Sequence, residues 1–183
     1  MYYALLNSNG KYFLRIDDDN EIDINLIERI YSYISTHNDV GYCGALPKRE
    51  NGMNANKGSV LSRHLKLGKR DLKITNVAFK VDLVDNVYIL NRQLINFENF
   101  LDSCKFFPWS FEDGLDQLSL KQKGYKIVTL PSAITLHHSH NHKNGINLKQ
   151  VYYYGRSKFI ILPVSNINTF PFNSPSNRLL FHP

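Results

Sequence analysis

The chain has 183 residues, 43% of them hydrophobic and 21% charged, which is typical of a globular protein with room for one domain and a substantial core. No apolar stretch approaches the roughly 20 residues needed to span a bilayer, and residues 1–6 are too short and lack the basic start of a signal peptide. The formal charge of +6 is compatible with phosphorylated or anionic partners or with a merely basic surface.

Hydrophobic periodicity divides the first half of the chain into alternating helices and strands. Residues 2–9 are expected to end a helix that Gly10 stops, and residues 11–16 to form a strand. Asp23 is expected to cap a helix whose apolar residues have helical spacing, and residues 40–46 to form a second strand. Residues 50–70, rich in Asn, Gly and Lys, are expected to be a long flexible loop of the kind that often forms a lid.

The second half continues the alternation. Strands are expected at residues 74–81, 87–90 and 127–130, with a further extended segment at 132–137, and helices at 92–101, 112–123 and 147–162. This pattern predicts an α/β fold with a mixed β-sheet flanked by helices. Residues 1–162 would form the domain, followed by an irregular tail at 163–183 that holds four of the seven prolines.

An acidic triplet, Asp17-Asp18-Asp19, follows the first apolar strand. Side chains alternate along a strand, so Asp17 and Asp19 are expected to project to the same side. Two such carboxylates repel each other unless a cation lies between them, and hard oxygen ligands suit Mg²⁺ or Mn²⁺ shared with substrate phosphates. The alternative is a solvated acidic turn.

A second acidic pair, Glu112-Asp113, lies in an aromatic setting that includes Trp109. Aromatic neighbours desolvate a carboxylate and raise its pKa, which favours a general base, whereas a helix N-terminus stabilises the anion. Simple helix capping by acidic residues is the alternative.

Histidines cluster from His137 to His142, where one neutral imidazole could complete a metal site. One functional histidine with the others solvated is the preferred interpretation, and a four-histidine zinc site is the weakly specified alternative. Cysteine-rich zinc spacing is absent.

The order of these three elements resembles family 2 glycosyltransferases with the nucleotide-diphosphosugar transferase (GT-A) fold. Residues 14–19 resemble the hydrophobic-Asp-x-Asp motif, residues 111–127 the Glu-Asp segment with its helix, and residues 130–138 a strand ending in histidine. The run Tyr152-Tyr153-Tyr154-Gly155-Arg156-Ser157 is similar to a helix of rhamnosyltransferase-like members. The resemblance covers about Ala4 to Leu162.

The resemblance implies a sugar transfer from a nucleotide-diphosphate donor to an acceptor hydroxyl, with inversion. Asp17, Asp19 and His137 would then hold Mg²⁺ or Mn²⁺ on the donor diphosphate, and Asp18 would position the ribose. Asp113 would be the catalytic base, and Glu112 and Trp109 would shape the site of a saccharide or lipid-linked acceptor. A non-catalytic remnant that serves as a binding or assembly module is the alternative.

In family members, the N-terminal half of the domain binds the nucleotide base and precedes the acidic strand. The chain is expected to lack this half. A sheet without those strands exposes edges, so a homo-oligomer or a partner that supplies the strands is expected. The two cysteines do not make a disulfide framework and fit a reducing cytoplasm. The scattered basic residues do not suggest nucleic acid. Peripheral contact with anionic lipid at the cytoplasmic face is one interpretation of the C-terminal aromatics, and core packing is the other.

Overall fold

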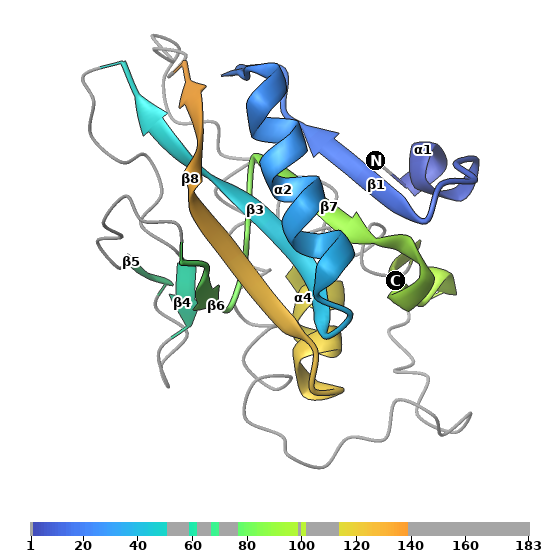
Figure 1. Cartoon of the computed structure of the whole chain (residues 1–183). Helices are drawn as coiled ribbons and strands as arrows, with labels where there is room; N and C mark the ends of the chain where they lie inside the picture. The colour runs from blue at the N-terminus through green and yellow to red at the C-terminus, as the bar shows by residue number, and fades with distance from the viewer. Residues whose placement is uncertain are drawn as a thin grey trace, which may run out of the picture.

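The computed structural model describes residues 2–50, 59–61, 67–69, 77–98, 100–101 and 114–138, which form a mixed sheet with helices on both faces (Figure 1). The main path of the sheet has the order β1-β7-β3-β8-β2, and β6 also pairs with β8. The strands are β1 (Tyr12–Ile16), β2 (Asn20–Glu21), β3 (Val40–Arg49), β6 (Phe79–Val81), β7 (Val87–Asn91) and β8 (Lys126–His137). Only β3 and β8 run parallel among these pairs.

The helix α2 (Ile24–Thr36) covers one face of the sheet. Asp23 begins it as expected, because its Oδ1 accepts a hydrogen bond from the backbone N–H of Leu26 at 2.8 Å. The buried face of α2 packs on alternate residues of the central strands. That core consists mainly of Leu26, Ile30, Ile34, Cys43, Ala45, Val87, Ile89, Val128 and Leu130.

The other face of the sheet packs against α1 (Tyr2–Leu6), the short 3₁₀ helix η1 (Arg92–Leu94) and α4 (Gly114–Gln122). The intervening residues of the same strands point to this side, as strand alternation requires. This second core is built mainly from Leu5, Tyr42, Tyr88, Leu90, Phe100, Leu120 and Ile127. Because both faces are covered, β7 is buried along its whole length.

The α/β class with a mixed sheet is confirmed. The expected strands at residues 11–16, 40–46 and 87–90 and the helix after Asp23 are present with small shifts at their ends. The two extended segments at 127–130 and 132–137 are instead one strand, β8, whose register against β3 shifts between Ala45 and Leu46. Pro131 lies in this irregularity and cannot donate to the ladder, which explains the apparent break in the sequence pattern.

Two further expectations need correction, and three others concern residues outside the described ranges. The segment at 50–70 is not structureless, because β4 (Ser59–Leu61) and β5 (Leu67–Lys69) pair as an antiparallel ladder. The helix expected at 92–101 starts as η1. The helix at 147–162, the tail from 163 and the domain boundary between them lie outside the described residues.

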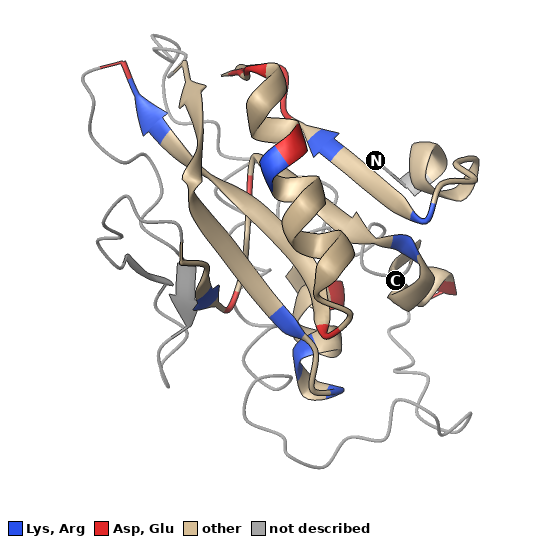
Figure 2. Ribbon diagram, viewed as in Figure 1, with Lys and Arg blue, Asp and Glu red and all other residues tan. Residues whose placement is uncertain are grey.

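Lys and Arg residues lie at or near the ends of the longer strands β1, β3 and β8, and β7 carries no charged residue (Figure 2). Among the described helices, none has the length and apolarity required to cross a membrane.

Candidate active site

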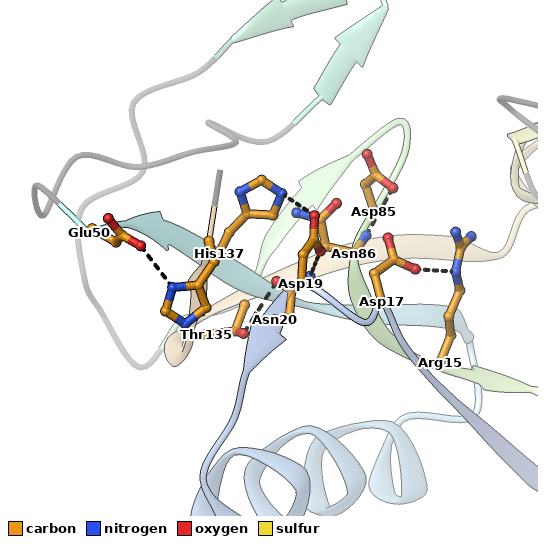
Figure 3. A network of polar contacts seen from close by, with 10 residues as sticks. Arg15, Asp17, Asp19, Asn20, Glu50, Asp85, Asn86, Thr135 and His137 are labelled. Carbon is orange, nitrogen blue, oxygen red and sulfur yellow. Dashed lines mark hydrogen bonds and ion pairs between the residues drawn. The ribbon is translucent and has the colours of Figure 1, made fainter. Parts of the chain in front are cut away.

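The acidic triplet lies in the turn between β1 and β2. Strand β1 ends at Ile16, and the backbone N–H of Asn20 donates to the carbonyl of Asp17 at 3.1 Å. The turn therefore interrupts strand alternation between Asp17 and Asp19, and the side chains of these two residues take separate directions (Figure 3).

Backbone pairing brings Asp19 to the end of β8. In the register of β2 against β8, Asn20 lies opposite His137, and the N–H of His138 donates to the carbonyl of Asp19 at 2.9 Å. The Oγ1 hydroxyl of Thr135 donates to the carbonyl of Glu21 at 2.8 Å and reinforces this pairing. Two segments more than a hundred residues apart therefore meet at the same edge of the sheet.

The side chains of Asp19 and His137 face each other across this pairing. Asp19 Oδ2 lies 3.2 Å from His137 Nε2, and Asp19 Oδ1 accepts a hydrogen bond from Asn20 Nδ2 at 2.7 Å (Figure 3). The two side chains are 22% and 25% exposed, so solvent or a ligand reaches both. Asn20 thus orients the carboxylate toward the imidazole.

The donor set of Asp19 and His137 fits a divalent cation. Neighbouring ligands of an octahedral ion, at about 2.1 Å from it, lie about 3 Å apart, and the observed separation is 3.2 Å. A carboxylate and an imidazole suit Mn²⁺, and two protein ligands leave positions for phosphate oxygens and water. The Nδ1 atom of His137 is buried and has no hydrogen-bond partner among the described residues.

Asp17 does not join this pair. Its Oδ1 accepts a hydrogen bond from Arg15 Nε at 2.9 Å, and Arg15 Nη1 also reaches the hydroxyl of Tyr88 at 3.3 Å. Asp18 is exposed at the tip of the turn. Within the described ranges, no group of three or more His, Cys, Asp or Glu residues is arranged to hold a metal ion. The expected trio of Asp17, Asp19 and His137 is therefore not assembled as such, because Asp17 pairs with Arg15.

Trp109, Glu112 and Asp113 lie outside the described residues, but α4 begins at Gly114, directly after Asp113. Two buried contacts hold the start of α4. The hydroxyl of Tyr42 donates to Asp116 Oδ2 at 2.8 Å, and the side chain of Gln117 bonds to the backbone of Val84. The sequence indicated no site role for Asp116 or Gln117, because their partners lie 74 and 33 residues earlier in the chain.

Residues 82–86 connect α4 with the acidic turn. Val84 binds Gln117, and the carbonyl of Asn86 accepts a hydrogen bond from the N–H of Asp17 at 3.0 Å. Asn86 has a φ of 66°, a left-handed conformation that Asn tolerates better than most residues. This loop therefore links the turn that carries Asp19 to the helix that follows Asp113.

The neighbouring histidine, His138, has a different environment. Its Nδ1 lies 2.9 Å from Glu50 Oε1 and its Nε2 lies 3.3 Å from Glu21 Oε2. Hydrogen bonds to Glu50 and then Glu21 raise the pKa of His138. Its two ring nitrogens face different carboxylates, so these three residues do not surround a common point. His140 and His142 lie outside the described residues.

Comparisons with known proteins bear on the fold and on the first part of the chain. A family model, glycosyl transferase family 2, matches residues 1–85, which include the acidic turn. The crystal structure of GalNAc-T7 with UDP, GalNAc and Mn²⁺ superposes with a TM-score of 0.57 at 12% identity, over 79% of this chain and 31% of that chain. A search of curated protein sequences finds no match.

These comparisons establish a GT-A-like fold and support the family resemblance over the first part of the chain. The chain spans about a third of the length of the solved structure that it matches. The residues matched by the family model end before His137 and before the Glu112-Asp113 segment, so the roles of these residues rest on the local geometry and on the sequence motifs.

Proposed function

We propose that this chain is the catalytic region of a glycosyltransferase that moves a sugar from a nucleotide-diphosphate donor to an acceptor hydroxyl. The observation that carries the proposal is the contact between Asp19 and His137 at 3.2 Å, formed where β2 meets the end of β8 in a GT-A-like sheet. The family 2 match over residues 1–85 and the GalNAc-T7 structure, solved with UDP, GalNAc and Mn²⁺, support the same class of reaction.

In this proposal Asp19 and His137 hold Mg²⁺ or Mn²⁺ beside the donor diphosphate. A bound divalent cation offsets the charge that builds on the departing diphosphate. Asp17 and Asp18 contact the donor from the same turn, with Asp18 near the ribose. Arg15, next to Asp17, balances the charge of that carboxylate when no donor is present.

Asp113 is proposed as the base that takes the proton from the acceptor hydroxyl as its oxygen attacks the anomeric carbon. A single displacement of this kind inverts the configuration. Glu112 and Trp109 border the acceptor in the same proposal. The contact between Gln117 and Val84 supports it, because it ties the helix that follows Asp113 to the loop that contacts Asp17.

Calorimetric titration with UDP, GDP and dTDP, each with and without Mn²⁺, tests the donor site. We expect one nucleotide to bind in a metal-dependent way, and Asp19→Asn to weaken this binding at least about tenfold, since a neutral amide is a poor ligand for a hard cation. Asp39→Asn is the matched control. Asp39 is an exposed carboxylate directly before the start of β3, and it is not part of the acidic turn.

Equal binding by wild type and Asp19→Asn would contradict the metal role. No binding of any nucleotide would instead favour a remnant that acts as an assembly or binding module.

A further inference from the structure

Strand β1 presents an open edge within the described part of the sheet, where it pairs only with β7. The flanking bonds fix which residues face β7: the carbonyl of Lys11 accepts from Arg92, and the N–H of Asp17 donates to Asn86. Backbone groups alternate along a strand, so Lys11, Phe13, Arg15 and Asp17 face β7. The N–H and C=O groups of the alternate residues Tyr12, Leu14 and Ile16 therefore point to the open edge.

The side chains of β1 have the pattern of an interior strand. Apolar residues lie on both of its faces, with Tyr12, Leu14 and Ile16 on one side and Phe13 on the other. Yet no residue of β1 is buried, whereas every residue of β7 is. Soluble proteins usually protect such an edge with charge, a bulge or a covering segment.

Exposed apolar side chains border this edge. Ile16 on β1 is 41% exposed, and Tyr31 on α2 is 50% exposed and packs edge-on against Tyr12 with ring centroids 5.6 Å apart. Ile16 and Tyr31 therefore add apolar surface beside β1.

We propose that β1 pairs antiparallel with β1 of a second copy of this chain, about a two-fold axis at Leu14. In this register the outward residues meet, with Leu14 opposite the partner's Leu14 and Tyr12 opposite the partner's Ile16. On the other face Phe13 lies opposite the partner's Arg15. Just beyond each end of β1, Lys11 lies opposite the partner's Asp17, a carboxylate that Arg15 of its own chain also contacts. Opposite charges therefore meet at both ends of the ladder.

Charge selects this register over its neighbours. A slip by two residues keeps the outward groups paired but places Arg15 opposite the partner's Arg15. A slip in the other direction places Lys11 opposite the partner's Arg15. Like charges directly opposite each other destabilise a strand pair, so the register centred on Leu14 is the favourable one of the three.

Sedimentation velocity of the full chain over a concentration series tests the proposal. We expect a monomer–dimer equilibrium that Leu14→Pro abolishes, because proline removes the outward N–H of Leu14 and none of the bonds between β1 and β7. Leu14→Ala is the matched control: it removes similar side-chain packing but keeps the N–H, and it should still form dimers. Circular dichroism confirms that both variants are folded.

A charge exchange tests the register itself. Lys11→Glu places a second acid opposite the partner's Asp17 at both ends of the ladder and should weaken association about tenfold. Adding Asp17→Lys to the same chain exchanges the pair and should restore association. A monomer at all concentrations, an assembly larger than a dimer, or failure of the exchange to restore dimers would overturn the proposal. No readout involves nucleotide, so these outcomes are independent of the proposed glycosyl transfer.

Discussion

The side-chain amide of Gln117 forms two hydrogen bonds with the backbone of Val84. Gln117 Oε1 accepts from the Val84 N–H at 2.7 Å, and Gln117 Nε2 donates to the Val84 carbonyl at 3.0 Å. Both residues are buried, at 1% and 5% exposure. Gln117→Leu leaves two backbone groups unsatisfied in the core and should lower the free energy of unfolding by about 3 kcal/mol, measured by urea denaturation.

Gln93→Leu is the control, because it replaces the same side chain in the same way at an exposed position. Its effect should stay within about 0.5 kcal/mol. Equal stability of Gln117→Leu and wild type would show that the hydrogen bonds to Val84 do not hold α4 in solution.

Gly44 on β3 allows the loop at residues 82–86 to approach the sheet. A Cβ atom at this position would lie 2.8 Å from both Cβ and Cγ1 of Val84, a β-branched side chain that cannot swing away easily. Gly44→Ala should therefore lower the free energy of unfolding by about 1–3 kcal/mol. Alanine also reduces the backbone entropy of the unfolded chain, which favours folding, but this effect is smaller than the cost of the clash.

Gly41→Ala is the matched comparison on the same strand. Its Cβ would meet Leu120 Cδ1 at 2.8 Å, the far end of a flexible side chain that can rotate. The cost should be smaller than for Gly44→Ala in the same denaturation experiment. The reverse order would mean that Val84 yields more readily than Leu120.

The sequence predicted most elements of the fold because their signals are local. Apolar runs mark β3 and β7, and Asp23 before a helical repeat marks the start of α2. The continuity of β8 was not predictable, because Pro131 resembles a strand end and only the parallel partner β3 carries the ladder past it. The ladder of β4 and β5 lay in a segment whose composition favours loops.

The candidate site was predictable in its residues and less so in its geometry. Asp19 and His137 stood out by residue type, and the structure brings them together. The expected same-side projection of Asp17 and Asp19 failed because the strand ends at Ile16 and a turn follows. The contact between Gln117 and Val84 has no local signal, since a glutamine on a helix meets a loop 33 residues earlier only in the folded chain.

His138 links the end of β8 to Glu50 and Glu21, and both contacts raise its pKa above the ordinary 6.5. A raised pKa in the folded state means that the imidazolium stabilises the fold below pH 6.5, and that this contribution is lost as pH rises through the folded pKa. An NMR titration of metal-free protein should show His138 titrating above 6.5, and Glu50→Gln should lower its pKa.

Glu98→Gln is the control for the titration, because Glu98 is an exposed acid that follows η1. It should leave the titration of His138 unchanged. If Glu50→Gln also had no effect, the contact between His138 and Glu50 would not persist in solution.

His137 contributes the second proposed ligand of the cation, and its imidazole can be removed with little change in size. His137→Gln keeps a group that can hydrogen-bond to Asp19 but is a much weaker metal ligand than imidazole. Calorimetry should show Mn²⁺-dependent nucleotide affinity reduced at least about tenfold, with metal-independent affinity little changed. His37→Gln is the matched control, because His37 is the exposed C-cap of α2. Equal losses in both variants would point to a general effect of the substitution, whereas a loss only at His137 follows from the position of its Nε2, 3.2 Å from Asp19 Oδ2.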